Sequence, residues 1–297
     1  MNYVAARKVS FAVSAALVLI SILLLIFKGL NLGIDFRGGT LLERGLPLGT
    51  TAAQVQEALA SLDGFDLGSS YVQPVDEAVE GQTVVLIRTR AAAETSAVEA
   101  VDRALEEAFG EVTVRRTEVV GPVIGRELVR KAVYAVVLAS LGILVYMSIR
   151  FELRFGIAAI LALLQDVFIV LGVLALSGQE LNTPFIAAML TVVGYSINNT
   201  IVVFDRIREN LQLRRARSLD ELVNASVGQT LMRQINTSLT TFFAAGALYF
   251  LGGSTIRDFT LPLVAGVLAG TYSSIFLAGP LWFVLTQRVP GRAAKTA

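Results

Sequence analysis

The chain has 297 residues, of which 54% are hydrophobic and only 16% are charged. A soluble domain carries about 25% charged residues, so this composition predicts an integral membrane protein, and the net charge of +1 offers no basic field for nucleic acid. The chain has no cysteine and no histidine, which excludes disulfides, thiolate metal sites and cysteine nucleophiles.

Six apolar segments approach the roughly 20 residues that a helix needs to cross a bilayer. Their approximate bounds are Val9–Phe27, Ala132–Ile149, Phe155–Ser177, Leu181–Phe204, Leu231–Gly252 and Phe259–Thr286. The first segment follows Arg7 and Lys8 in the manner of a signal peptide. It is longer than the usual apolar core of a signal peptide and lacks a clear cleavage site, so we interpret it as a retained membrane anchor.

The Lys and Arg residues that flank these segments divide unequally between the two sides. One side receives Arg7, Lys8, Arg150, Arg154, Arg206, Arg208, Arg214, Arg215, Arg217, Arg288, Arg292 and Lys295. The short loops on the other side hold only Arg257. By the positive-inside rule both termini and a basic loop, residues 205–230, are cytoplasmic. The protein is therefore expected in the cytoplasmic (inner) membrane, with the long segment after the first span outside.

That long segment, residues 31–125, changes sharply in composition and is predicted to form a domain outside the membrane. Its predicted elements are a strand (about Thr40–Leu46), a helix (Thr51–Leu62), two strands (Ser69–Val75 and Thr83–Arg90), a helix (Ser96–Phe109) and a strand (Glu111–Val119). The order β-α-β-β-α-β is typical of a ferredoxin-like sandwich. Since none of its residues form a catalytic constellation, we interpret it as a binding or mechanical module.

The predicted fold class is therefore an α-helical polytopic membrane protein with one extracytoplasmic α+β domain. The predicted parts are residues 1–30 (helix 1), 31–125 (the outer domain), 126–288 (helices 2–6) and 289–297 (a cytoplasmic tail). In the basic loop, the sequence SLDE at Ser218–Glu221 fits a capping box and predicts a short helix at the membrane surface. We interpret this as an interfacial helix, with a specific partner site as the alternative.

Two asparagines, Asn198 and Asn199, stand side by side in the apolar fourth span. An unpaired polar group in hydrocarbon is costly, so each amide needs a partner. A hydrogen bond to a neighbouring helix is a sufficient explanation, because an amide does not titrate and cannot itself carry a proton.

Arg233 begins the fifth span and is followed by several hydroxyl side chains. Thr237, Thr240 and Thr241 share a helix face with it and form a polar stripe. Two roles remain open: an Arg whose charge reaches the cytoplasmic interface, or a functional cation, since the stripe is more than such an interfacial Arg needs.

Asp166, next to Gln165, lies near the centre of the third span. Ionisable groups inside a span usually face the protein interior and often mark ion pathways. The sequence leaves two roles open, a relay or coordination partner and a protonated Asp that bonds a neighbouring helix. With no histidine in the chain, proton chemistry depends on such carboxylates, on water and on the field of Arg or Lys.

Three glycine-containing stretches are predicted to have packing or hinge roles that depend on their backbone. GIDFRGG at Gly33–Gly39 ends in the pair Gly38 and Gly39, which suits a tight backbone after the first span. GPVIG, with Gly121 and Pro122, ends the last strand before the second span. GTYSS at Gly270–Ser274 supplies small residues for close helix packing.

Together these stretches resemble the SecF family of protein-export membrane proteins, a branch of the resistance-nodulation-division superfamily. The resemblance rests on GIDFRGG, GPVIG, GYSINNTIVVFDRIREN at Gly194–Asn210, QTLMRQINTSLTT at Gln229–Thr241 and GTYSS. It covers essentially the whole chain, and the stretch in the fourth span is its most specific part.

The resemblance implies a subunit that pairs with SecD, as a separate chain or fused to it, and that associates with the SecYEG channel, with YajC and YidC as further partners. Such a pair uses the proton-motive force to draw preproteins outward after SecA has driven them with ATP. Protons are then the coupling ion, and no other cofactor, metal or nucleic acid is expected.

The family carries GYSINDT in the fourth span, and its Asp is the membrane carboxylate of the proton path. Asn199 stands at that position here, whereas Arg233 matches the family's Arg on the next span. An Asp beside an Arg can alternate between an ion pair and a protonated acid, whereas an amide stays neutral. We therefore predict that this chain conducts protons poorly or not at all. The intact flanking motif favours an introduced Asp-to-Asn substitution over a natural variant that uses Asp166 or a SecD carboxylate.

Two other classes of function are compatible with this sequence. One is half of a small-molecule or lipid exporter of the same superfamily, although an outer domain of this size leaves little room for a substrate pocket. The other is a scaffold that stabilises the translocon without transport. An enzyme is not expected, because the sequence has no nucleophile–base pair, metal cluster or phosphate loop.

Overall fold

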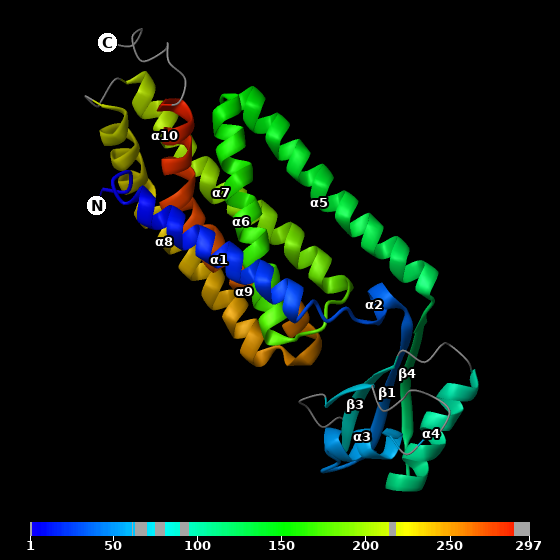
Figure 1. Ribbon diagram of the computed structural model, residues 1–297. Helices are drawn as coiled ribbons and strands as arrows, with labels where there is room; N and C mark the ends of the chain where they lie inside the picture. The colour runs from blue at the N-terminus through cyan, green and yellow to red at the C-terminus, as the bar shows by residue number, and fades with distance from the viewer. Residues whose placement is uncertain are drawn as a thin grey trace.

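The computed structural model has two parts, a bundle of long helices and a small α+β domain that projects from one end of it (Figure 1). The structure describes residues 2–60, 62, 70–74, 81–89, 95–213 and 218–287. The predicted tail 289–297 and several of the predicted cytoplasmic cations lie outside these residues, namely Arg214, Arg215, Arg217, Arg288, Arg292 and Lys295.

The outer domain contains one antiparallel sheet with the strand order β2-β3-β1-β4. Its elements are β1 (Gly39–Pro47), α3 (Ala52–Ala60), β2 (Tyr71–Pro74), β3 (Gln82–Thr89), α4 (Thr95–Phe109) and β4 (Thr113–Val120). They follow one another in the predicted order β-α-β-β-α-β. The central strand β1 pairs along its length with β3 and β4, so that Thr40 lies between Thr89 and Val119.

Both helices of this domain cover the same face of the sheet. Alternate residues of the central strands point toward them, as the period of a half-buried strand requires. The resulting core consists of Leu42, Leu46, Val55, Leu59, Val85, Ile87, Val101 and Leu105, each at most 1% exposed. Arg44 is also fully buried, and its guanidinium binds Asp102 of α4 at 2.6 Å (Nε–Oδ1), which satisfies its charge.

The membrane part is built from long helices packed side by side. They are α1 (Arg7–Phe27), α5 (Pro122–Arg150), α6 (Leu153–Ser177), α7 (Thr183–Gln212), α8 (Leu219–Leu251) and α9 (Gly253–Ser273), which continues through a π-helical turn η1 (Ser274–Ala278) into α10 (Gly279–Gln287). Five segments of the described residues are long and apolar enough to cross a membrane: Arg7–Phe27, Val123–Arg150, Leu153–Ser177, Thr183–Gln212 and Ile256–Gln287.

The fifth predicted span, Leu231–Gly252, is not among those five. It forms the second half of α8, which lies alongside α9 in the bundle (Figure 1). Its polar residues, from Arg233 to Thr241, lower the mean hydropathy of every window that contains them. The predicted capping box at Ser218–Glu221 does not form, because Ser218 precedes the helix without a side-chain cap hydrogen bond. The prediction that this helix is short was also wrong, because it continues without a break to Leu251.

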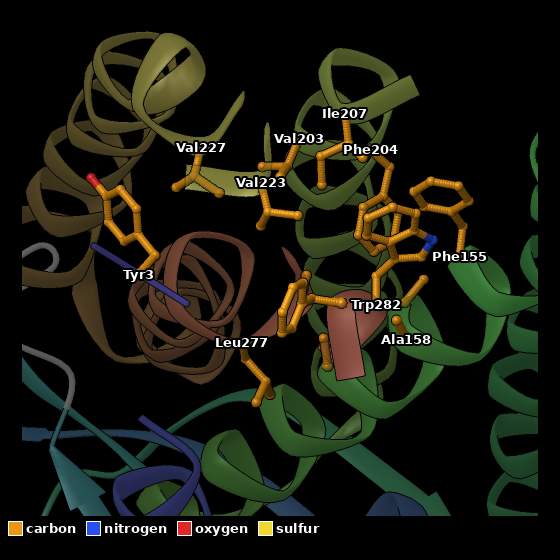
Figure 2. Close-up of a cluster of buried hydrophobic side chains, with 14 of the residues drawn as sticks. Tyr3, Phe155, Ala158, Val203, Phe204, Ile207, Val223, Val227, Leu277 and Trp282 are labelled. Atoms are coloured by element: carbon orange, nitrogen blue, oxygen red, sulfur yellow. The ribbon is translucent and has the colours of Figure 1, made fainter. Parts of the chain in front are cut away.

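A large apolar cluster holds the helices together at the end of the bundle opposite the outer domain (Figure 2). The ring of Phe155 stacks on Trp282 with a centroid distance of 4.7 Å and meets Phe204 edge-on at 4.9 Å. Val223 of α8 and Tyr3 near the N-terminus belong to the same cluster. It therefore joins the N-terminal segment to α6, α7, α8 and α10.

A short connection joins the first helix to the outer domain. It contains α2 (Ile34–Arg37), followed by Gly38 (φ +82°) and Gly39 (φ +148°), and both backbone angles favour glycine. A Cβ on Gly39 would lie 2.4 Å from the carbonyl oxygen of Thr89, and one on Gly125 would lie 2.7 Å from that of Phe36. These glycines thus let the backbone of β1 and the start of α5 approach their neighbours closely.

Directly after β4, Gly121 precedes α5, and Pro122 occupies the first turn of that helix. A Pro there lacks an N–H that the helix would leave unpaired anyway. The two residues therefore mark the change from strand to helix, as their sequence predicts, while a hinge role at this position stays a prediction.

Candidate functional site

The two asparagines of α7 face in different directions. Asn198 is exposed in this chain, whereas Asn199 is buried with 2% of its surface accessible. The amide nitrogen Nδ2 of Asn199 is buried and has no hydrogen-bond partner among the described residues. An unpaired polar group of this kind is costly inside a membrane, and no hydrogen bond among the described residues offsets that cost.

Arg233 lies level with Asn199 on the adjacent helix. α7 and α8 run antiparallel, and Tyr195 donates a hydrogen bond to Ser238 at 3.0 Å (Oη–Oγ) while Asn210 donates to Ser226 at 2.8 Å (Nδ2–Oγ). Asn199 lies one turn beyond Tyr195 on α7, and on the antiparallel α8 one turn before Ser238 holds Arg233 and Gln234. Asn199 is therefore at the same level as that turn of α8. Gln234 is buried and Arg233 is exposed, so the Arg faces away from the body of this chain.

We call the exposed residues near this level of the adjacent helices α7 and α8 the polar face. It consists of Thr191, Gly194 and Asn198 on α7 and of Arg233, Asn236, Thr237 and Thr240 on α8, all exposed in this chain. Thr241 is half-buried beside it and donates to the carbonyl oxygen of Thr237 at 2.9 Å. Arg233, Thr237 and Asn198 are thus all exposed on two adjacent helices, whereas Asn199 is buried.

Asp166 lies in a different environment, in the interior between α6, α7 and α9. Its side chain is 0% exposed, and Oδ2 accepts hydrogen bonds from Ser196 Oγ at 2.6 Å and from Ser273 Oγ at 2.7 Å. The second oxygen, Oδ1, is buried without a partner among the described residues. We call these three residues the Asp166 cluster.

A column of buried polar side chains on α8 continues from this region. Ser226, Thr230, Gln234 and Ser238 recur every four residues and are at most 7% exposed, so they share one face of the helix. Ser274 donates to Gln234 at 2.7 Å (Oγ–Oε1), and Gln234 donates to Thr230 at 3.0 Å (Nε2–Oγ1). Sequence reasoning assigned the serines of GTYSS to packing alone and missed Ser196 and the buried column, although their four-residue spacing could have revealed it.

A charged cluster joins the outer domain to the membrane helices. Arg88 of β3 pairs with Glu180, in the α6–α7 loop, at 2.9 Å (Nη1–Oε2) and lies 3.8 Å from Asp258 of α9 (Nη2–Oδ2). Asp258 also accepts hydrogen bonds from Gln179 at 2.9 Å and Asn182 at 3.1 Å. None of these residues was singled out from the sequence, because the pairs join segments far apart in the chain.

Two open pockets, of about 240 and 230 Å³, flank this charged cluster, and Tyr71, Arg88 and Glu180 line both. Burial raises the pKa of Tyr71 above its ordinary value, and the negative charge of Glu180 adds to that rise while Arg88 opposes it. Within the described ranges, no group of three or more Asp and Glu side chains could hold a metal ion. The junction is therefore a polar contact between two parts of the protein.

Family comparisons cover most of the chain. Residues 100–288 match the family described as protein export membrane protein SecD/SecF, C-terminal. Residues 23–43 match the SecD/SecF GG motif, which includes Gly38 and Gly39.

Individual relatives give the same result. The protein translocase subunit SecF of Alicyclobacillus acidocaldarius is 39% identical over 289 residues, which cover 96% of this chain and 92% of that protein. The subunit SecF of Pseudomonas aeruginosa is 38% identical over 302 residues, covering 100% of this chain and 96% of the relative.

The fold also resembles solved structures. The crystal structure of SecDF from Thermus thermophilus, described as a translocon-associated membrane protein, has a TM-score of 0.85 at 38% identity and covers 97% of this chain. A SecDF structure in a super-membrane-facing form has a TM-score of 0.74. This chain spans only 39% and 40% of the length of those two chains. The chain therefore belongs to the SecD/SecF family of protein-export membrane proteins, as a member of its SecF branch.

Proposed function

We propose that this chain pairs with SecD and that the pair uses the proton-motive force to assist preprotein translocation through SecYEG after the SecA step. Its relatives are named SecF translocase subunits, and the SecDF structures that it resembles join a SecF-like part to a longer chain. Both termini and the basic loop lie in the cytoplasm in this proposal, with the outer domain across the cytoplasmic membrane.

The polar face carries the proposal. Arg233, Thr237 and Thr240 of α8 are exposed in this chain, near the level of the buried amide of Asn199. If this face met lipid, the guanidinium and Asn198 would stay without partners, which is costly in hydrocarbon. A second membrane subunit would cover them, and small residues such as Gly194 allow its helix to approach closely. SecD is the partner that the SecDF structures indicate.

The same geometry suggests what Asn199 does to proton movement. A carboxylate at this position would lie one helix away from Arg233 and alternate between charged and protonated forms, and Arg233 would stabilise the charged form. The amide of Asn199 is neutral at every pH. We infer that it blocks proton transfer at this step, as an introduced Asp-to-Asn substitution would, and leaves the remainder of the subunit intact.

The test restores the carboxylate in membrane vesicles that hold this chain with its SecD partner. SecA and ATP start the translocation of a preprotein, ATP is then removed and a proton-motive force is applied. Vesicles with Asn199→Asp should fully translocate more preprotein than vesicles with the parent chain, and a protonophore should remove the difference. The matched control is Gln212→Glu, the same amide-to-carboxyl change at an exposed position near the end of α7.

Two outcomes would contradict the proposal. If the fraction of preprotein fully translocated does not depend on the proton-motive force in either chain, the subunit is a translocon scaffold without transport. Equal completion by Asn199→Asp and the parent, both sensitive to the protonophore, would show that Asn199 does not limit proton transfer.

A further inference from the structure

We propose that the Asp166 cluster is a proton-binding site inside the membrane part of this chain, in series with the position of Asn199. The proton would bind Oδ1 of Asp166, while the hydroxyls of Ser196 and Ser273 hold Oδ2. This inference rests on the proposed function, because it names a second step of the same proton transfer.

The hydrogen-bond pattern indicates where the proton binds. Both serine hydroxyls donate to Oδ2, at 2.6 and 2.7 Å, and so leave Oδ1 as the only carboxyl oxygen with free capacity. Oδ1 is buried and has no partner among the described residues. A buried anionic oxygen without a hydrogen-bond partner is costly, whereas a proton on Oδ1 removes the charge.

No cationic side chain of the described residues pairs with Asp166. Around it α6 packs against α1, α5, α7, α9, η1 and α10, whose Arg, Lys, Asp and Glu residues lie toward the helix ends. The titratable groups nearer their middles are four tyrosines. Tyr134 and Tyr146 are exposed on α5, Tyr195 bonds Ser238, and Tyr272 bonds Ser10 and Ser14. The carboxyl group is thus more acidic than the tyrosines around it, and no ion pair with a described residue fixes its charge.

The buried column on α8 supplies a polar route toward this site. Ser274 follows Ser273 directly and donates to Gln234, and the column runs from there through Thr230 to Ser226. Ser226 accepts a hydrogen bond from Asn210, near the end of α7 where the basic residues gather. Hydroxyl and amide groups at this spacing can hold water molecules, which can carry a proton. The column therefore extends the Asp166 cluster toward the predicted cytoplasmic end.

The backbone around Ser273 is also specialised. The π-helical turn η1 begins at the next residue, Ser274, and single π turns within helices occur frequently at functional sites. A Cβ on Gly270 would lie 3.2 Å from Cβ of Ser196, so the glycine lets α9 approach α7 closely enough for both serines to reach Asp166. Asn199 follows Ser196 by three residues on the same side of α7. Both steps of the proposed path thus share one helix face.

Infrared difference spectroscopy on the full chain with its SecD partner in lipid vesicles tests the site directly. A pH change should produce a carboxyl C=O band that Asp166→Asn removes and Ser273→Ala shifts in frequency, since that variant loses one hydrogen bond to the group. The matched control is Asp205→Asn, an exposed Asp on α7, which should leave the band in place. Co-purification with SecD in normal yield shows that each variant folds.

The outcomes separate this inference from the proposed function. A band that persists unchanged in Asp166→Asn would overturn the site, whatever the export assay gives. A band that Asp166→Asn removes supports the site even if Asn199→Asp fails to increase export, in which case the role proposed for Asn199 fails by itself. If both hold, Asp166→Asn added to Asn199→Asp should abolish the gain in proton-driven export, and a retained gain would overturn the series arrangement.

Discussion

Arg88 of β3 and Glu180, in the loop before α7, form an ion pair with an Nη1–Oε2 distance of 2.9 Å, and each side chain is only 9% exposed. Asp258 at the start of α9 lies beside the same guanidinium. The outer domain is thereby connected through charge to two elements of the membrane part. One of them, α9, carries Ser273 of the Asp166 cluster at its other end.

We expect the removal of one partner of this pair to destabilise the contact between the two parts. Glu180→Gln leaves Arg88 buried with less compensating charge, and breaking a buried pair in this way costs about 3–5 kcal/mol. The result should be faster hydrogen–deuterium exchange in β3 and in the α6–α7 loop. The control is Glu118→Gln, which breaks an exposed pair with Arg116 and should cost roughly 0–1 kcal/mol. Equal exchange in both variants would contradict a structural role for Arg88.

The polar face predicts an asymmetric response to bulky substitutions of glycine. A Cβ on Gly194 or on Gly142 would meet no atom of this chain within 4 Å, so both positions should tolerate Leu as far as folding is concerned. Gly194→Leu should reduce co-purification with SecD by tenfold or more, about 1.4 kcal/mol, because it separates the helices at the proposed interface. Gly142→Leu, on α5, should leave co-purification with SecD unchanged. Normal SecD recovery with Gly194→Leu would place the partner elsewhere.

The GG motif predicts a local cost for a side chain at Gly39. Gly39→Ala would put a Cβ 2.4 Å from the carbonyl oxygen of Thr89 at a φ of +148°, so the pairing of β1 with β3 has to shift. Gly49→Ala also has a positive φ, +89°, but meets no atom within 4 Å, and its strain alone is about 1–3 kcal/mol. Thermal unfolding should show a larger loss of stability for Gly39→Ala than for Gly49→Ala. The reverse order would mean that the close approach of the backbone is unimportant.

The membrane orientation can be tested by cysteine labelling, because the chain has no cysteine of its own. Leu48→Cys, at an exposed turn of the outer domain, should react in intact cells with a maleimide that cannot cross the membrane. Leu213→Cys, exposed at the end of α7, should react only after the membrane is opened. The parent chain supplies the background. Labelling of Leu213→Cys in intact cells would reverse the proposed orientation.

Much of the fold follows from local patterns, and the sequence predicts it well for that reason. In the outer domain the predicted ends of β1, β3 and α4 lie within one residue of those observed, since strand alternation and helix periodicity are local properties. The helix that holds Arg233 was harder to predict. Its start after Ser218 was predicted correctly, but its continuity through the polar segment to Leu251 depends on packing against α7 and α9.

The candidate site could be predicted only in part. The sequence identified Asp166 as a polar group in a span, but its contacts with Ser196 and Ser273 depend on how three helices meet. The orientation of Asn198 and Asn199 likewise follows from the packing of α7. The role of Arg88 could not be predicted from the sequence, because a charge on a strand is ordinarily solvated and its partner Glu180 belongs to a distant loop.

Proton flux itself tests the central claim most directly. The chain and its SecD partner are reconstituted in liposomes that enclose a pH-sensitive dye, and a membrane potential is imposed. Asn199→Asp should conduct protons at least tenfold faster than the parent chain, and Gln212→Glu should match the parent. Equal flux in the parent and Asn199→Asp would contradict the claim that the amide at position 199 interrupts a proton path through this subunit.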